Sequence, residues 1–118
     1  MMIPERALEL GRLIGQSDEY QSLKRANDRM MGEAELRVAL DKLRALQMAL
    51  AEQADRGEAP KPEQQAALDQ LISGVQGHPL YQGVVAAQAN FDKLMYKVNE
   101  QILDGMKKGA DSRIITLG

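Results

Sequence analysis

Apolar residues recur at alternating steps of four and three along this chain. The first long series consists of Leu36, Leu40, Leu43, Gln47, Leu50 and Ala54, in which only Gln47 is polar. The second consists of Leu80, Val84, Ala87, Phe91, Leu94, Val98 and Ile102. A shorter series near the N-terminus consists of Ile3, Ala7, Leu10 and Ile14. Such spacing puts each series on one face of an α-helix, so we expect amphipathic helices at all three places.

Proline, serine and glycine mark where these helices begin and end. Pro4 suits a first helical turn, and Ser17 followed by two acids is typical of an N-cap. Gly57 and the prolines at positions 60 and 62 predict a loop. We expect a single domain over residues 1–118, with N-terminal helices over 4–31, a long helix over 33–56, a short helix over 62–75, a long helix over 79–108 and a tail over 110–118.

The predicted fold class is all-α. The only β-branched cluster, at residues 114–116, is too short to form a sheet by itself. The loop and short helix leave room for the two long helices to turn back on each other. We therefore expect a long antiparallel helical hairpin with shorter flanking helices and no β-sheet. Two points stay open: whether residues 15–17 are a break or a kink, and whether the tail is flexible or docks.

Two long helices have more apolar surface than a simple hairpin buries, so we expect part of it to pack against another copy of the chain. The expected helix-packing and oligomer interface consists of Leu36, Leu40, Leu43, Leu50, Leu80, Val84, Phe91, Leu94, Val98 and Ile102. The expected assembly is a dimer or a small even oligomer. Gln47 either fixes the register of such an assembly or lies at the solvent margin.

The composition is that of a soluble globular protein. An apolar fraction of 44% and a charged fraction of 27% argue against disorder. The net charge of −2 gives no sign of the basic surface that phosphate contacts need, so direct nucleic-acid binding is not expected. The N-terminus lacks the apolar core of a signal peptide, and no apolar run is long enough to span a membrane. We therefore expect a cytoplasmic protein that does not enter the membrane.

The residues that usually carry catalysis are scarce. There are no cysteines, which removes disulfides, thiolate nucleophiles and cysteine-held metals. His78, the one histidine, precedes a proline at a helix start and has no acid or cysteine companion nearby, so we expect a turn or capping residue. No P-loop, nucleophile elbow, dinucleotide fingerprint or HExxH motif occurs. We expect no enzyme: no catalytic residue, no cofactor-binding residue and no metal site.

Methionine is the remaining chemical signal. Its flexible, polarizable side chain adapts to irregular surfaces. The residues concerned are Met30, Met31, Met48, Met95 and Met106. They either fill gaps in an aromatic-poor core or line a groove that binds a partner.

Four short segments follow one another along the chain. They are SDEYQSLK at 17–24, LRALQM at 43–48, HPL at 78–80 and LMYKVNEQI at 94–102. Their order and spacing, over about residues 7–106, resemble those of the YlbF/YmcA family of small all-helical bacterial proteins. The resemblance implies a cytoplasmic, non-catalytic regulatory protein. It implies action in complexes that influence ribonuclease Y-dependent RNA processing and decay, and through it competence, sporulation and biofilm formation.

The best-studied members of that family assemble with a further protein into a complex that carries iron–sulfur clusters. This chain departs from them, because without cysteine it supplies no thiolate ligand. We therefore expect no cofactor, and as partners a second copy of the chain and a ribonuclease-associated protein complex. Two alternatives belong to other classes. A direct RNA-binding protein needs a basic stripe or stacking aromatics, and a secreted helical-hairpin protein usually has a tryptophan–glycine turn, whereas this chain has no tryptophan.

Overall fold

The computed structural model describes the backbone of residues 2–117 and the side chains of residues 2–111. The elements are α1 (Met2–Gln16), α2 (Asp18–Gly32), α3 (Ala34–Asp55), α4 (Pro62–Gln76) and α5 (Pro79–Leu117). Within this part of the chain there is no strand, so the predicted all-α fold class is confirmed.

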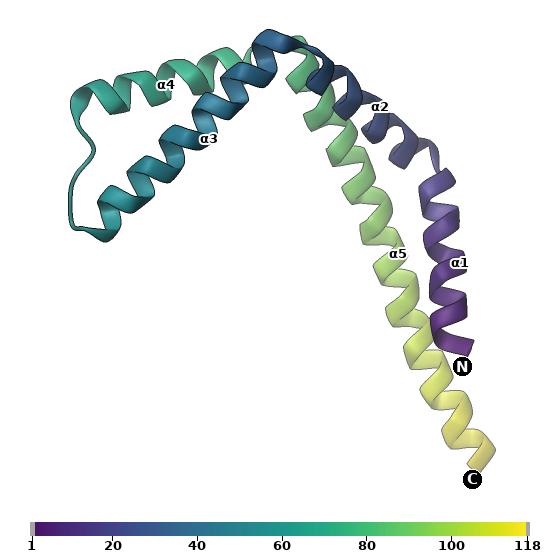
Figure 1. The fold of residues 1–118 in the computed structure, drawn as a ribbon. Coiled ribbons are helices and arrows are strands. Elements are labelled where there is room, and N and C mark those ends of the chain that lie inside the picture. The colour runs from purple at the N-terminus through teal and green to yellow at the C-terminus, as the bar shows by residue number, and fades with distance from the viewer. Residues whose placement is uncertain (1, 118) are drawn as a thin grey trace.

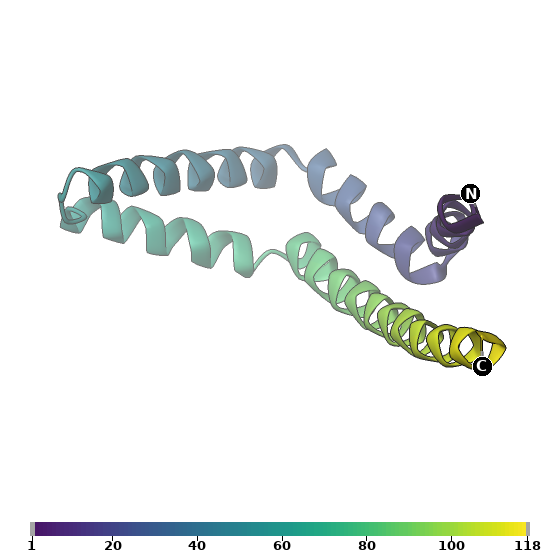
Figure 2. The same cartoon turned by 90° about the horizontal axis from the view of Figure 1, so that it is seen from below.

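The helices form two antiparallel arms that meet at a wide bend (Figure 1). One arm pairs α3 with α4, and the other pairs α2 with α5. α1 continues the second arm beyond α2, and both chain ends lie at its far end. Figure 2 shows the molecule from below. One side is formed by the helices α1, α2 and α3, and the chain returns along the other side through α4 and α5. The molecule is elongated as a result, measuring 70 × 37 × 22 Å.

The two longest helices do not pair in the way that the sequence suggested. Within residues 2–117, α3 packs on α4 and α5 packs on α2, so the expected hairpin between α3 and α5 is wrong. The reason is that the loop after α3 reverses the chain, so that α4 packs along α3 in the opposite direction. At 15 residues, α4 is roughly 22 Å long and returns the chain to the bend. α5 therefore starts beside the end of α2 and runs along that helix.

The segment expected as a tail continues α5. This helix has 39 residues, a length of roughly 58 Å. Gly105 and Gly109 each lower helix stability by about 1 kcal/mol, but with no proline after them they do not end the helix. Residue 118 and the side chains of 112–118 lie outside the described residues.

Two side chains act as N-caps at helix starts. The Ser17 hydroxyl accepts a hydrogen bond from the Tyr20 amide at 3.1 Å and begins α2, so the chain breaks between α1 and α2. Nδ1 of His78 accepts from the Leu80 amide at 3.1 Å in the first turn of α5. The capping role expected of His78 is confirmed.

The buried core of the described chain is small. Its buried apolar residues are Leu36 and Val75, each 2% exposed, and Ala87, 9% exposed. Leu36 lies in the first turn of α3 and Val75 in the last turn of α4, so both lie close to the bend. In the other arm, the rings of Tyr20 on α2 and Phe91 on α5 meet edge to face, with centroids 5.7 Å apart.

The accessible surface of the chain is far larger than that of a compact domain. It measures 9219 Å², whereas a compact monomer of this mass exposes roughly 6,300 Å². The radius of gyration is 21.7 Å against about 13.5 Å for a compact domain of 118 residues. A compact fold would therefore bury about 2,900 Å² of surface that this chain exposes to solvent.

Gly57 gives a first prediction, because its backbone has φ +78°, the only positive value among the described residues. It ends α3 in a Schellman arrangement: the Gly57 amide donates to the Ala54 carbonyl at 3.0 Å and the Glu58 amide to Gln53 at 2.9 Å. We expect Gly57→Ala to lower the free energy of unfolding by about 1 kcal/mol, measured by urea denaturation.

The matched control for Gly57 is Gly74→Ala, at an exposed position of α4. A Cβ at residue 74 meets nothing within 4 Å, and its backbone is helical. We expect this change to raise the free energy of unfolding by roughly 0.5–1 kcal/mol. Equal effects of the two changes would contradict the role assigned to Gly57.

Candidate protein-interaction surfaces

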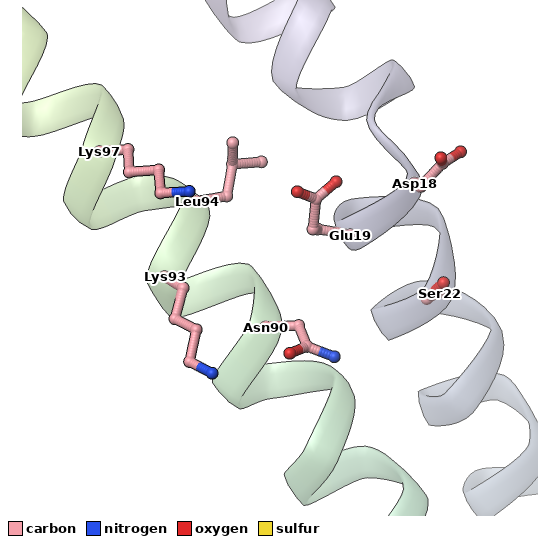
Figure 3. Close-up of a pocket in the computed structure, with 7 residues that line it drawn as sticks. All are labelled: Asp18, Glu19, Ser22, Asn90, Lys93, Leu94 and Lys97. Atoms are coloured by element: carbon pink, nitrogen blue, oxygen red, sulfur yellow. The ribbon is translucent and has the colours of Figure 1, made fainter.

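A polar cleft separates the start of α2 from the middle of α5 (Figure 3). Its lining residues are Asp18, Glu19, Ser22, Asn90, Lys93, Leu94 and Lys97. The two acids come from α2 because they follow the Ser17 cap, where the positive end of the helix dipole favours them. The two lysines project from α5 at i and i+4, on the facing side.

The charges of this cleft are solvated rather than buried. Asp18, Lys93 and Lys97 are exposed and Glu19 is half-buried. Among the residues with described side chains, no ion pair joins α2 to α5. The cleft can therefore form ion pairs with a charged surface on another molecule, but it does not exclude water from its own acids.

A second, apolar groove runs between α1 and the C-terminal half of α5. It has a volume of about 930 Å³, and its lining residues are Met2, Ile3, Arg6, Ala7, Leu10, Ile102, Gly105, Met106 and Gly109. A smaller apolar hollow next to it is lined by Leu10, Lys97, Val98, Gln101 and Ile102. Among residues 2–117, no Cα of α1 comes within 8 Å of a Cα of α5, so the two helices do not close over the groove.

The ten residues expected at a helix-packing interface fall into three levels of exposure. Leu36 is buried. Ile102 is 45% exposed and lines the groove between α1 and α5. The half-buried ones are Leu40, Leu43, Leu50, Leu80, Val84, Phe91, Leu94 and Val98. The residues on α3 belong to the arm with α4, and those on α5 chiefly to the arm with α2, so the structure does not bring the two sets together.

Gln47 lies on the exposed side of α3 in the single chain. Leu46 and Gln53 are half-buried instead, while Ala54 is exposed. The packed face of this part of α3 is formed by Leu43, Leu46, Leu50 and Gln53, and Gln47 and Ala54 lie beside it.

Sequence reasoning missed the groove itself. Each wall was visible as a series: Ile3, Ala7 and Leu10 on one helix, and Val98 and Ile102 on the other. The signal that extends the second wall is the continuation of the same spacing to Met106. What the sequence does not show is that the two walls face each other across an open gap.

The methionines divide between half-buried and exposed positions. Met30 and Met95 are half-buried and contribute to packing. Met106 is 63% exposed and lines the groove, and Met31, 48% exposed, lines a hollow at the bend with Leu40. Met48 is exposed on α3.

No group of three or more histidine, cysteine, aspartate or glutamate side chains is placed to hold a metal ion in the described part of the chain. None of the described helices is both long and apolar enough to cross a bilayer.

These features define a small all-α protein whose polar cleft and apolar groove lie on open helix faces of the arm formed by α1, α2 and α5. The chain belongs to the YlbF/YmcA family: the family model described as "Control of competence regulator ComK, YlbF/YmcA" matches residues 3–107. The match spans nearly the whole chain, confirms the resemblance seen in the four short segments, and supports a regulatory role. No curated protein matches the chain.

Proposed function

We propose that this chain is a non-catalytic helical adaptor of the cytoplasm that self-associates and binds a protein partner of the RNA-processing machinery. In this role it resembles modulators of ribonuclease Y-dependent RNA processing. The observation that carries the proposal is the amount of accessible surface, 9219 Å² on a chain of 13.0 kDa, in a member of a regulatory family. A chain with so little of its apolar surface buried gains stability by binding other proteins.

The polar cleft supports a binding role over a catalytic one. General acid–base catalysis relies on groups whose proton affinity is tuned by burial or by close charged neighbours. Asp18, Lys93 and Lys97 are exposed to water, and the lysines form no ion pair with the acids across the cleft. An exposed arrangement of two acids and two lysines suits a polar rim around a protein–protein contact.

Affinity capture from the native host tests the partner. The tagged chain is purified from lysate with and without added nuclease, and the recovered proteins are identified by mass spectrometry. We expect a ribonuclease or an associated factor in both samples, because the proposed contact is between proteins. Recovery only without nuclease indicates a bridge of RNA, and recovery of no such factor in either sample contradicts the proposal.

The purified chain tests the alternative of direct RNA binding. We expect no shift of a single-stranded RNA in a gel at physiological salt, since the described surface combines acids and bases and has no stacked aromatic platform. A shift that weakens steeply as salt rises would favour the RNA-binding alternative over the adaptor.

A further inference from the structure

We infer that the hollow at the bend, between α2 and α3, binds an acidic amphipathic helix of a protein partner. This inference rests on the partner binding in the proposed function, and it names the surface and the chemistry of the segment bound. The hollow has a volume of about 310 Å³ and lies where the C-terminal end of α2 meets α3 (Figure 1). The helix expected there has apolar side chains flanked by glutamate or aspartate.

The apolar part of the lining is adaptable. It consists of Met30 and Met31 from α2 and of Leu40 and Leu43 from α3. Met31 is 48% exposed, and the other three are half-buried. Methionine side chains repack around apolar groups of different shapes, and Met-rich grooves take up the apolar face of a helix in this way. The hollow therefore suits leucine or methionine side chains of an amphipathic helix.

The charged part of the lining is mostly basic. Arg37 and Arg44 stand at i and i+7 of α3, so they lie two turns apart on one helix face. Nη1 of Arg37 donates a hydrogen bond to the Met31 carbonyl oxygen at 3.2 Å, which holds its guanidinium beside the hollow. Arg44 is exposed and, among the side chains that the structure describes, forms no ion pair. Asp41 is the acid among the described residues of the lining, and the two arginines outnumber it.

The segment around the hollow is basic in a chain that is acidic elsewhere. Residues 24–44 contain six lysine or arginine residues and four aspartate or glutamate residues, a net charge of +2. The whole chain has a net charge of −2, so the rest of it carries −4. An acidic segment of a partner is therefore attracted to the bend and repelled by the rest of the chain, which favours binding at this place.

The lining favours a protein segment over RNA. Proteins that bind single-stranded RNA combine a basic groove with aromatic rings on which the bases stack. No aromatic side chain is among the described residues that line this hollow, and the carboxylate of Asp41 repels phosphates. A helix with carboxylates beside its apolar side chains complements both parts of the lining.

Synthetic peptides test the inference on the full chain. The probe is a helical peptide of about 18 residues, with leucine at i, i+4 and i+7 and glutamate beside each leucine. One comparison peptide has glutamine for every glutamate, and another has serine for every leucine. Binding is followed by NMR of ¹³C-labelled methionine methyl groups. We expect the acidic leucine peptide to shift Met30 and Met31, to leave Met48 outside the hollow unchanged, and to bind at least roughly tenfold more tightly than either comparison peptide.

Charge reversal at the hollow gives a matched pair of variants. Arg44→Glu and Lys42→Glu change the net charge equally at exposed positions of α3, and Lys42 does not line the hollow. We expect Arg44→Glu to weaken binding of the acidic peptide roughly tenfold and Lys42→Glu to weaken it less than about threefold, with equal circular dichroism. Equal weakening by the two variants would mean that overall charge rather than the hollow attracts the peptide, which overturns the inference.

Removal of the acid from the lining should tighten binding, a gain that loss of folding cannot imitate. We expect Asp41→Asn to bind the acidic peptide roughly threefold more tightly than the parent. The control is Asp55→Asn, an equal change of net charge at an exposed position where α3 ends, and its affinity should stay close to the parent's. If Asp41→Asn binds no more tightly than Asp55→Asn, the inference is overturned.

Further outcomes separate this inference from the proposed function. If Arg44→Glu captures the ribonuclease factor from lysate as well as the parent does, the inference is overturned while the proposed function stands. If the acidic peptide binds at the hollow but lysate yields no ribonuclease factor, the hollow is supported and the partner named in the proposed function is wrong. No shift of Met30 and Met31 by the acidic peptide at millimolar concentration overturns the inference, and a shift by single-stranded RNA alone assigns the hollow to RNA instead.

Discussion

Leu36→Asp is expected to unfold the arm that α3 and α4 form. Leu36 is 2% exposed, in a chain with very few buried apolar side chains in its described part. Aspartate there loses the apolar burial and places a carboxylate at a position that is 2% exposed. We expect a loss of about 4 kcal/mol or more, a large part of the 5–15 kcal/mol by which domains are usually stable.

The control for Leu36 is Val38→Asp, two residues further along the same helix. Val38 is 48% exposed, so its replacement changes helix propensity and surface charge but buries no charge. In thermal melting followed by circular dichroism, we expect Leu36→Asp to lose helix at all temperatures and Val38→Asp to melt close to the parent. A Leu36→Asp protein with the parent's melting temperature would mean that Leu36 does not stabilise the arm of α3 and α4.

Phe91→Asp is expected to separate α5 from α2. Phe91 is half-buried in the face of α5 that packs on α2, and its ring meets that of Tyr20 at 5.7 Å. The change removes the aromatic pair and puts a charge into the contact, for an expected loss of about 3 kcal/mol in urea denaturation.

The control for Phe91 is Tyr96→Asp on the same helix, since Tyr96 is 67% exposed. It removes an aromatic side chain of similar size from the outer face, and we expect a change within about 0.5 kcal/mol of the parent. Equal losses from Phe91→Asp and Tyr96→Asp would show that the α2–α5 contact contributes little to stability.

The all-α fold class, the positions of helix starts and the end of α3 followed from local chemistry. Ser17, His78 and Gly57 each act through hydrogen bonds or dihedral angles of neighbouring residues, which a sequence displays directly. The choice of partner for each helix did not follow, because both long helices had an apolar face that could pack on the other. Their pairing depends on the loop after α3 and on the length of α4, which together return the chain to the bend before α5 begins.

The candidate surfaces were harder to predict from the sequence than the helices. An apolar series shows which side of a helix is suited to packing, but not whether the packing partner lies within the chain. Val98 and Ile102 continue one series, yet Val98 is half-buried while Ile102 is 45% exposed and faces a gap. The difference arises because α2 packs along α5 only as far as the chain break at Ser17. Beyond that break, α1 lies further from α5.

The bend between the arms has a consequence for how tightly a bound protein can be held. The α3–α4 arm points away from the α1–α5 groove, so the two surfaces lie apart on the molecule. A protein that contacts both arms is held at two places, and its second contact forms at high effective concentration once the first is made. Weak individual contacts then suffice for firm but reversible attachment.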